Sequence, residues 1–345
     1  MHSYIKRHKQ SSASWDIPTL CAAYNWPTGL PGGGVIAIVE LGGGWNSSDV
    51  AAAFASMSQP TPVIRDISVD GTVNAPGGDA DGEVALDIQV AAASYFMATG
   101  SPATIYIYWA KDIATAVRAA TADGCDVCSI SWGADEAVWG VAAAVDMEAA
   151  AKAAANAGMV VLAASGDNDS SDGGPNPANV DVPASCPHVI GCGGTSKPHD
   201  GVETVWNNNP GQSTGEGTGG GYSTIFPTQA WQGLDPAGPS GRMVPDVSAN
   251  ADPMVGYEIV LNGQIEIVGG TSAVAPLYAG LFAALGKKLG FITPDLFLNP
   301  IGFNDITVGD NGAYTALPGP DPCTGLGSPV GTVIESIIAA KNKTS

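Results

Sequence analysis

The sequence predicts an α/β protein built on a mostly parallel, twisted β-sheet with helices on both faces. Two observations lead to this expectation. Short apolar runs of strand length recur along the chain, and they are apolar at nearly every position rather than at alternate ones. Ala-rich stretches of helical length lie between these runs. Strands that are buried on both faces and alternate with helices are typical of a parallel sheet that is covered on each side.

The expected elements follow one another along the chain. The apolar runs place strands at 35–41, 104–110, 126–133, 159–166 and 188–195. The Ala-rich stretches place helices at 49–57, 82–98, 111–123 and 145–157, and a later apolar stretch places one at 271–288. No internal repeat or linker separates two cores. We therefore expect one large domain over 15–345, preceded by a flexible extension at 1–14.

The charge balance limits the class of partner. The 345 residues include 33 Asp and Glu against 13 Lys and Arg, a formal net charge of −20. Such a surface repels nucleic acid and anionic membranes, so we expect neither as a partner. The longest apolar run, 273–286, contains Pro276 and is too short to span a bilayer. The acidity serves either solubility or work near the sequence pI of about 4.2, and composition does not choose between them.

The N-terminal sequence and the cysteines bear on the cellular location of the protein. The basic stretch 1–16 is followed by no apolar segment, so it does not have the pattern of a secretory signal. This leaves a cytoplasmic product, or a mature fragment with an added start Met. Cys125 and Cys128 form a single C-x-x-C inside an apolar run, which favours buried thiols over a metal or redox site. A bridge between Cys186 and Cys192 stays open.

Several polar residues lie where the expected strands end, which is where sites collect in such sheets. Glu40 closes the first strand and Asp167 follows the fourth. Glu83 and Asp87 stand four residues apart in an otherwise apolar helix, and they therefore share one helix face. Like charges at that spacing cost a few tenths of a kcal/mol in water, and more when they are buried. This cost indicates that Glu83 and Asp87 lie together because they have a function.

Ser272 lies in the stretch GGTSAVAP at the start of the last apolar helix. One interpretation is a helix cap, and the other is a nucleophile on a sharp turn. A serine nucleophile needs a base. His2 and His8 fall in the N-terminal extension, His188 falls in an expected strand and His199 in a loop, and none has the glycine-rich setting at a helix start. Carboxylates remain as candidates for the base.

The ordered motifs AIVELGGG, GEVALD, SISWG, AASGD, CGGT, GGGYS, VPDVSANADP, GGTSAVAP and DPCTGLGSP resemble those of the sedolisins, or serine-carboxyl peptidases, from about Trp15 to about Gly331. The resemblance implies a subtilisin-like fold and acid-active endopeptidase activity on protein or peptide substrates, together with one bound calcium ion. Sedolisins are also typically made with a large propeptide, and none precedes Trp15 here, so the chain is either trimmed or works without one. We expect a monomer in an acidic extracellular environment, with the cytoplasm as the alternative.

Carried over to this chain, the family pattern makes Ser272 the nucleophile, Glu83 its general base, Asp87 the residue that orients Glu83, and Asp167 the oxyanion-hole residue. Glu40 would extend the chain of carboxylates behind Glu83, and its alternative is a satisfied carboxylate at a strand end. The assignment is chemically sensible, because a base works best when its pKa lies near the working pH. Imidazole is protonated in acid, whereas a carboxylate remains available down to about pH 4. A protonated aspartate, in turn, donates a hydrogen bond to an oxyanion.

The tail at 303–329 is rich in Gly, Pro and Asp and suggests a cation site. Calcium takes six to eight oxygens and mixes carboxylates with carbonyls. The family pattern places side-chain ligands at Asp305 and Asp321 and carbonyl ligands at Ile306, Leu317 and Gly319. Leu317 stands where the family commonly has glycine. The alternative is an ordinary Asp-rich turn.

Two stretches are candidates for substrate binding. The residues Ser131, Trp132 and Gly133 end a strand, and Gly219, Gly220 and Gly221 form a glycine stretch, and edges of this kind bind extended peptides. Trp132 could instead pack in the core. Asp181 matches a position in the family's specificity pocket and would favour Lys or Arg before the scissile bond. The rival to all of these roles is a catalytically inactive protein with the sedolisin fold that binds or supports other molecules.

Overall fold

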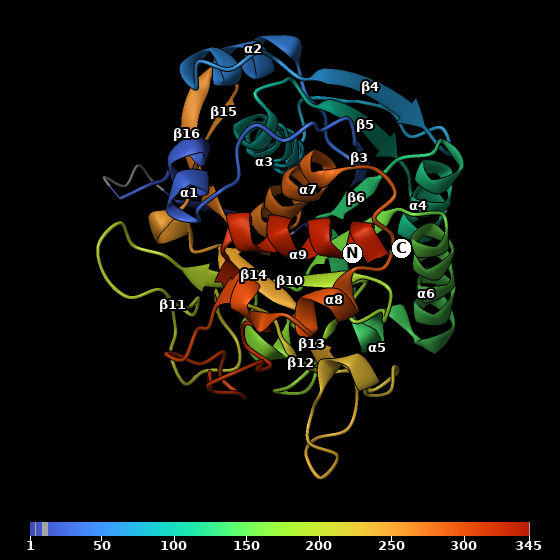
Figure 1. Cartoon of the computed structure of the whole chain (residues 1–345), viewed down its shortest axis with the longest axis vertical. Coiled ribbons are helices and arrows are strands. Elements are labelled where there is room, and N and C mark those ends of the chain that lie inside the picture. Colours follow the sequence, from blue (N-terminus) through green and yellow to red (C-terminus); the bar gives the residue numbers. More distant parts are fainter. Residues whose placement is uncertain (4, 9–12, 345) are drawn as a thin grey trace.

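The computed structural model describes residues 1–3, 5–8 and 13–344 of the chain. Its centre is a sheet in the order β11–β10–β8–β6–β3–β5–β4, with β14 also paired to β10, and all of its strand pairs are parallel except β10–β11 (Figure 1). The strands of this sheet are β3 (Val35–Glu40), β4 (Val63–Ser68), β5 (Thr104–Trp109), β6 (Val127–Ile130), β8 (Val160–Ala164), β10 (Ile190–Ser196), β11 (Thr204–Val205) and β14 (Val247–Asn250). The predicted mostly parallel α/β sheet is confirmed.

Helices cover both faces of this sheet, as the sequence predicts. One face carries α3 (Asp81–Thr99) and α7 (Val274–Leu285), and the other carries α4 (Ile113–Ala122) and α6 (Val141–Asn156) (Figure 1). The remaining α-helices are α1 (Ile17–Ala23), α2 (Ser47–Ser56), α5 (Glu136–Trp139), α8 (Thr293–Phe297) and α9 (Gly331–Thr344). No helix in the described ranges is both long and apolar enough to cross a bilayer.

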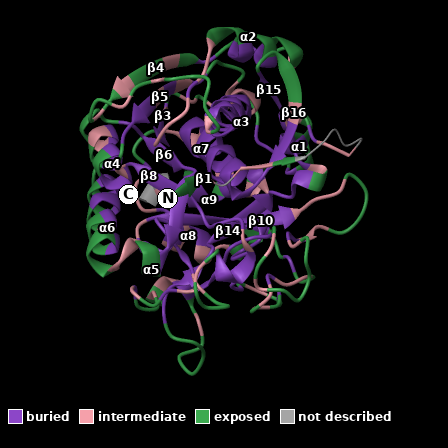
Figure 2. Cartoon of the chain, turned by 180° about the vertical axis from the view of Figure 1, so that it is seen from behind, coloured by how far each residue is buried: buried purple, intermediate pink, exposed green. Residues whose placement is uncertain are grey.

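The continuous apolar runs arise because each central strand faces two cores. In β3, Ile36 and Ile38 pack with α3 and α7, whereas Ala37 and Val39 pack with α4 and α6. All six cysteines are buried free thiols, which confirms the interpretation of Cys125 and Cys128 and shows no bridge between Cys186 and Cys192. Figure 2 shows α3 and α7 buried almost throughout, whereas α4 and α6 each keep an exposed side.

The structure also contains elements that the sequence interpretation missed. The strand β4 was not predicted, because it lies at the sheet edge and mixes apolar with polar side chains, most of them exposed, instead of forming an apolar run. The expected strand at 126–133 is divided into β6 and β7 (Trp132–Asp135), and β7 leaves the central sheet to pair with β9 (Asp181–Val182). A separate hairpin of β15 (Tyr257–Leu261) and β16 (Gln264–Gly269) precedes α7.

The described parts of the segment 1–14 do not stand apart from the domain, in contrast to the expected extension. The strand β1 (His2–Ser3) pairs with β7, and β2 (Lys6–His8) pairs with β16, in both cases antiparallel. Both partner strands offered unpaired backbone groups at an edge, which a neighbouring segment satisfies. Residues 4 and 9–12 lie outside the described ranges.

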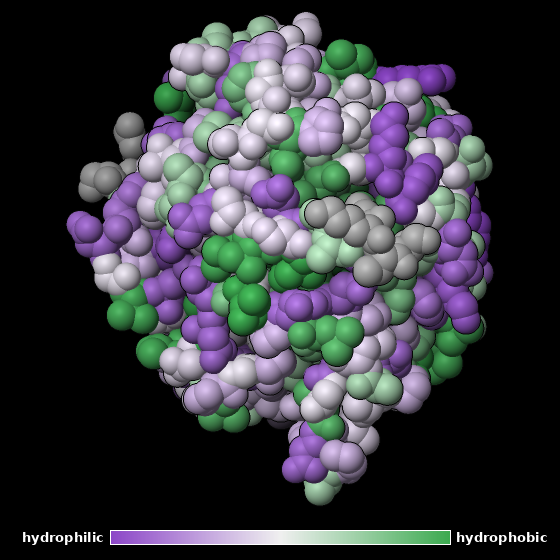
Figure 3. Space-filling model, viewed as in Figure 1, coloured by the Kyte–Doolittle hydropathy of each residue, from purple (hydrophilic) through white to green (hydrophobic). Residues whose placement is uncertain are grey.

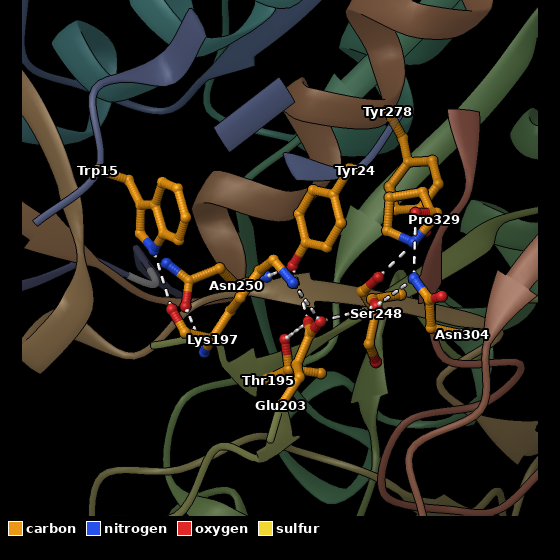
Figure 4. Close-up of polar contacts among 11 residues, drawn as sticks. Trp15, Tyr24, Thr195, Lys197, Glu203, Ser248, Asn250, Tyr278, Asn304 and Pro329 are labelled. Carbon is orange, nitrogen blue, oxygen red and sulfur yellow. Dashed lines mark hydrogen bonds and ion pairs between the residues drawn. The ribbon is translucent and has the colours of Figure 1, made fainter. Parts of the chain in front are cut away.

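The carboxylate of Glu203 ties distant segments together below α1. It accepts hydrogen bonds from Tyr24 (2.7 Å), Thr195 (2.6 Å) and Ser328 (3.0 Å), and it pairs with Lys197 (3.0 Å) (Figure 4). These partners come from the C-cap of α1, from β10 and the residue that follows it, and from β18 (Ser328–Pro329) in the tail. The network therefore fixes the Gly/Pro/Asp-rich tail to the end of the sheet.

Polar side chains cover most of the face shown in Figure 3, with apolar side chains in small groups between them.

Candidate active site

The helices α3 and α7 set the spacing of the site, because they pack directly against each other. The hydroxyl of Ser94 on α3 donates to the carbonyl of Leu277 on α7 (3.1 Å). A side chain at Gly280 would collide with Ser94, so the close approach of the two helices requires glycine at this position. α3 carries Glu83 and Asp87 in its first turns, and α7 follows directly after Ser272. The packing of two helices therefore brings the carboxyl pair to the serine.

Ser272 lies in a short 3-10 turn, Thr271–Ala273, between β16 and α7. The turn is entered through Gly270, whose φ of 115° is a backbone conformation that residues with a side chain rarely adopt. Ser272 is fully buried, and its hydroxyl makes no hydrogen bond of good geometry in the structure. Its side chain therefore does not cap the helix, and the second interpretation, a hydroxyl available for reaction, fits the geometry better.

Three carboxyl groups gather behind Ser272. Glu83, Asp87 and Glu40 are each completely buried. Asp87 accepts a hydrogen bond from Ser131 (2.8 Å), and Glu40 accepts one from the indole of Trp132 (3.0 Å). Neither oxygen of Glu83 has a partner of good geometry. The side chains of Asp87 and Glu40 are thus held by neighbours, while that of Glu83 is not.

The electrostatics of this cluster favour protons on the carboxyls. Burial raises the pKa of Glu83 well above its ordinary value, the nearby charges of Asp87 and Glu40 raise it further, and the Ser272 hydroxyl lowers it in part. Burial raises the pKa of Asp87 to about 8, although its bond from Ser131 lowers it in part. The pKa of Glu40 is also raised well above its usual value, by burial and then by Asp87. The three groups titrate as a unit that resists carrying more than one negative charge.

Asp167 lies on the other side of the serine. Its Oδ1 accepts two hydrogen bonds from Thr271, one from the backbone N–H (2.7 Å) and one from the hydroxyl (2.8 Å). Its Oδ2 is buried and has no partner. Burial raises the pKa of Asp167 to about 7, and the bonds from Thr271 oppose this rise only in part. In acid, Asp167 is therefore a neutral group with a hydroxyl to donate.

The residues predicted to bind substrate surround this centre. Gly133 and Trp132 lie in β7, and the Ser131 hydroxyl lies 3.3 Å from the Ser272 carbonyl in addition to its bond to Asp87. The glycine stretch 219–221 lies beside Ser165 and Gly166, since Gly219 donates to the Gly166 carbonyl (2.8 Å). Trp132 packs in the core and binds Glu40, which favours the core alternative for its side chain.

Asp181 lies in β9, next to β7, and is almost completely buried. Neither of its carboxylate oxygens has a partner, and burial raises its pKa well above the usual value. An unpaired carboxyl at this depth suits a pocket that a ligand completes.

Among the side chains that the structure describes, no histidine forms a hydrogen bond with the hydroxyl of Ser272. His188 pairs with Glu148 (2.6 Å), and His199 stacks on Trp15. His2 does not lie at a frayed end as expected, because it lines a pocket of about 510 Å³ together with Asp167 and Lys6. The sequence interpretation missed Thr271 as the partner of Asp167, and it assigned Ser131 to substrate binding instead of to the bond with Asp87. Only Thr271 had a signal, its place directly before the candidate serine.

The tail also brings its predicted residues together. Asp305 accepts the backbone N–H of Gly319 (2.9 Å), and Asp321 accepts those of Leu317 (3.2 Å) and Cys323 (2.8 Å). Burial raises the pKa of Asp321 to about 6, and the charge of Asp305 adds to the rise. The described residues contain no cluster of three or more His, Cys, Asp or Glu side chains arranged around a metal, so an ion here would need backbone carbonyls. Two facing carboxylates in a carbonyl-rich loop fit calcium in that way.

The chain is similar to known proteins in sequence and in fold. The sequence pattern of the subtilase family matches residues 47–296. Kumamolisin from Bacillus sp. (strain MN-32) is 45% identical over 342 residues, which cover 90% of this chain and 61% of that protein. Sedolisin from Pseudomonas sp. (strain 101) is 36% identical over 169 residues, which cover 44% of this chain and 29% of that protein.

The solved structure of Pseudomonas sedolisin with two molecules of pseudo-iodotyrostatin superposes with a TM-score of 0.84 at 23% identity and covers 96% of this chain and 99% of that one. This likeness confirms the predicted subtilisin-like fold. The chain spans less than two thirds of the curated relatives above. The chain belongs to the subtilase family, and it is similar in sequence to kumamolisin and sedolisin.

Proposed function

We propose that the protein is an acid-active serine-carboxyl endopeptidase that cleaves protein or peptide substrates through an acyl-enzyme on Ser272. The observation that carries the proposal is the burial of Glu83 and Asp87 beside an unbonded serine hydroxyl, opposite a buried Asp167 with one free oxygen. A protein that only binds or supports other molecules gains nothing from several unpaired carboxyl groups in its core, because each of them destabilises the fold once it ionises. The inactive alternative is therefore disfavoured.

The first chemical step follows from the arrangement. Ser272 Oγ attacks the carbonyl carbon of the scissile peptide, and Glu83 accepts the hydroxyl proton as the C–O bond forms. Asp87, fixed by Ser131, holds the remaining shared proton beside Glu83. The oxygen of the tetrahedral intermediate accepts a hydrogen bond from protonated Asp167. Glu83 then returns its proton to the leaving amine as the C–N bond breaks, which gives the acyl-enzyme.

Water completes the cycle by the same route in reverse. It attacks the acyl carbon while Glu83 takes its proton, and the Ser272 oxygen leaves with that proton. Glu40 would support the base indirectly, because it is held by Trp132 and its charge raises the pKa of Glu83. This role makes it a positioning residue and not a group that touches substrate.

Acid conditions suit the oxyanion half of this mechanism, and the raised pKa of Glu83 sets the lower pH limit of the base half. Asp167 donates only while it is protonated, and its pKa is raised to about 7, so it holds its proton through the acid range. The carboxyl cluster accepts one negative charge, which Glu83 needs as a base, and resists a second. We infer a mature form that works in an acidic extracellular environment. The excess of acidic over basic residues disfavours nucleic acid and anionic membranes as partners.

We further propose one structural calcium ion and a preference for basic side chains before the scissile bond. Asp305 and Asp321 would supply carboxylate oxygens, and Ile306, Leu317 and Gly319 would supply carbonyls. Leu317 does not have a left-handed backbone and its side chain is 59% exposed, so replacing the family's glycine raises no steric objection. Asp181 would meet the basic side chain. We also expect the protein to act as a monomer.

The test is hydrolysis of a denatured protein substrate from about pH 3 to 7, a range that spans carboxyl and imidazole titrations. Wild type should cleave fastest in the acid part, and Ser272→Ala should lose at least about 10³-fold of the rate. Cys21→Ser, at a buried position remote from the proposed chemistry, controls for effects of substitution in the core. Wild-type cleavage that is fastest above pH 7, or full activity in Ser272→Ala, would overturn the proposal.

A further inference from the structure

Ser131 lies at the point where the chain leaves the central sheet, as the one residue between β6 and β7. A peptide that pairs with β7 meets the residues that follow it, because β1 pairs there with Trp132 and Gly133. The side chain of Ser131 is fully buried, and its hydroxyl donates to Asp87 Oδ1 at 2.8 Å. The proton of this hydroxyl is therefore used within the carboxyl cluster and is not left for a substrate.

Two acceptors lie near the single proton of the Ser131 hydroxyl. Asp87 Oδ1 lies 2.8 Å from Ser131 Oγ, and the backbone carbonyl oxygen of Ser272 lies 3.3 Å from it. The shorter of two such bonds is the stronger, particularly when the acceptor is a carboxylate. The proton therefore lies toward Asp87, and Ser131 Oγ is close to both the carboxyl pair and the residue that carries the nucleophile.

The bond from Ser131 makes the two oxygens of Asp87 unequal. Oδ1 accepts the hydroxyl proton, whereas Oδ2 is buried and has no partner. When Asp87 is protonated, its own proton therefore lies on Oδ2. Glu83 shares one face of α3 with Asp87, and both of its oxygens are also buried without a partner. Glu83 is thus the acceptor that the fold leaves for this proton.

A second serine on the same strand shows that such a bond is not a general result of burial. Ser129 lies in β6, two residues before Ser131, and its side chain is also fully buried. The hydroxyl of Ser129 has no partner in the structure. Of these two buried serines, only Ser131 bonds to the carboxyl pair, which indicates a task that Ser129 lacks.

Without the Ser131 hydroxyl, no contact in the described part of the chain would distinguish the two oxygens of Asp87. Neither oxygen would then have a hydrogen-bond partner. The terminal torsion of an aspartate is broad and roughly two-fold, so the carboxyl group would be free to turn over. Its proton would be divided between two positions, and only one of them directs it toward Glu83.

We propose that Ser131 is a positioning residue of the reaction, which fixes the proton of Asp87 on Oδ2 and so directs it toward Glu83. The inference rests on the proposed peptidase function and adds to it a residue that acts through Asp87. Ser131 does not touch the scissile bond in this role. Its loss should therefore change the catalytic step and its pH dependence, and leave the binding of substrate nearly unchanged.

The Ser131 bond also affects the pH at which the carboxyl pair can act. A donor to a carboxyl group stabilises its ionised form, and the bond from Ser131 lowers the pKa of Asp87 in part, against the larger effect of burial. The pair acts while it holds one proton, and a second proton neutralises Glu83 as a base. Glu40 from β3 and Asp167 from the segment after β8 also act on Glu83, and their charges raise its pKa. Loss of the Ser131 bond therefore moves the uptake of the second proton to higher pH.

The experiment measures kcat and KM of the whole 345-residue chain on one peptide, from about pH 3 to 7. Ser131→Ala should lower kcat by about tenfold and move the acid limb of the profile to higher pH by about one unit, because a hydrogen bond to a charged group is lost. KM should stay within about twofold of wild type. Ser129→Ala, the matched control, should keep both kcat and the acid limb.

Two further variants separate this role from a loss of packing. Ser131→Thr keeps the hydroxyl and should keep the acid limb of wild type, although the added methyl group lowers stability. Asp87→Asn holds no titrating proton, so adding Ser131→Ala to it should not move the acid limb further. If wild type cleaves in acid while Ser131→Ala keeps its acid limb or changes only KM, the role of Ser131 is wrong and the peptidase stands. Full activity in Ser272→Ala would overturn the proposed function itself.

Discussion

Thr271 binds a single oxygen of Asp167 twice, through its backbone N–H at 2.7 Å and its hydroxyl at 2.8 Å, and so leaves Asp167 Oδ2 free and buried. This arrangement decides which oxygen of Asp167 carries the proton. Oδ1 already accepts two hydrogen bonds, so the proton lies on Oδ2. The free Oδ2 is then the donor in acid. An asparagine would reproduce the pattern, with its carbonyl toward Thr271 and its amide group in place of the Oδ2 hydroxyl.

The first prediction concerns this donor. Asp167→Ala should lower kcat by about 10²- to 10³-fold at every pH, because the oxyanion loses its donor. Asp167→Asn should retain most of the acid rate and lose less rate than wild type between pH 6 and 8, since an amide does not titrate. The measurement is the pH profile of kcat on one peptide. An asparagine variant whose rate falls with pH as steeply as that of wild type would contradict the assignment of the donor.

The second prediction separates Glu83 from Asp87. Glu83→Gln should lower kcat by about 10²- to 10⁴-fold, because an amide accepts no proton from Ser272. Asp87→Asn keeps an acceptor for Ser131 but removes a like charge that raises the pKa of Glu83. The acid limb of the pH profile of Asp87→Asn should therefore move to lower pH, and this variant should lose less rate than Glu83→Gln. The pH profile of kcat/KM checks both variants, and equal losses with no shift for Asp87→Asn would place the two residues in the same role.

The third prediction concerns stability. The folded-state pKa is raised to about 8 for Asp87 and to about 7 for Asp167, whereas an unfolded aspartate titrates near 3.9. Their contribution is fully present below about pH 3.9 and is lost as pH rises through 7 to 8. The free energy of unfolding should therefore fall from pH 4 to pH 8, by about 1.4 kcal/mol per pH unit for each such carboxyl. Denaturant titrations measure the slope, and Asp167→Asn should make it shallower by about one proton.

The fourth prediction concerns calcium. Chelator should lower the melting temperature at pH 6, and added Ca²⁺ should restore it, because two facing carboxylates in the tail repel each other without a cation. Asp305→Asn should remove most of the response, while Asp70→Asn, an exposed aspartate remote from the tail, should keep it. A melting temperature indifferent to chelator in wild type would remove the site.

The sequence predicted the sheet, the covering helices and the placing of two carboxylates in one buried helix, because these depend on local patterns. Buried parallel strands appear as continuous apolar runs, and two carboxylates in an apolar helix are conspicuous. The edge strand β4 lacks such a run, since its exposed face tolerates polar residues. Contacts between distant segments left no local pattern, and so the pairing of β1 with β7 and the bond from Ser131 to Asp87 became visible only in three dimensions.

The absence of a side chain at Gly280 determines how a substitution at this position would disturb the proposed active site. α3 carries Glu83, the proposed general base, and α7 follows Ser272, the proposed nucleophile. The separation of the two helices is set by the contact between Ser94 and the backbone at Gly280. A methyl group added at Gly280 would collide with Ser94 and push α3 and α7 apart, and with them Glu83 and Ser272. Because α3 and α7 are buried almost throughout, the proposed active site should tolerate substitutions at this contact no better than the hydrophobic core does.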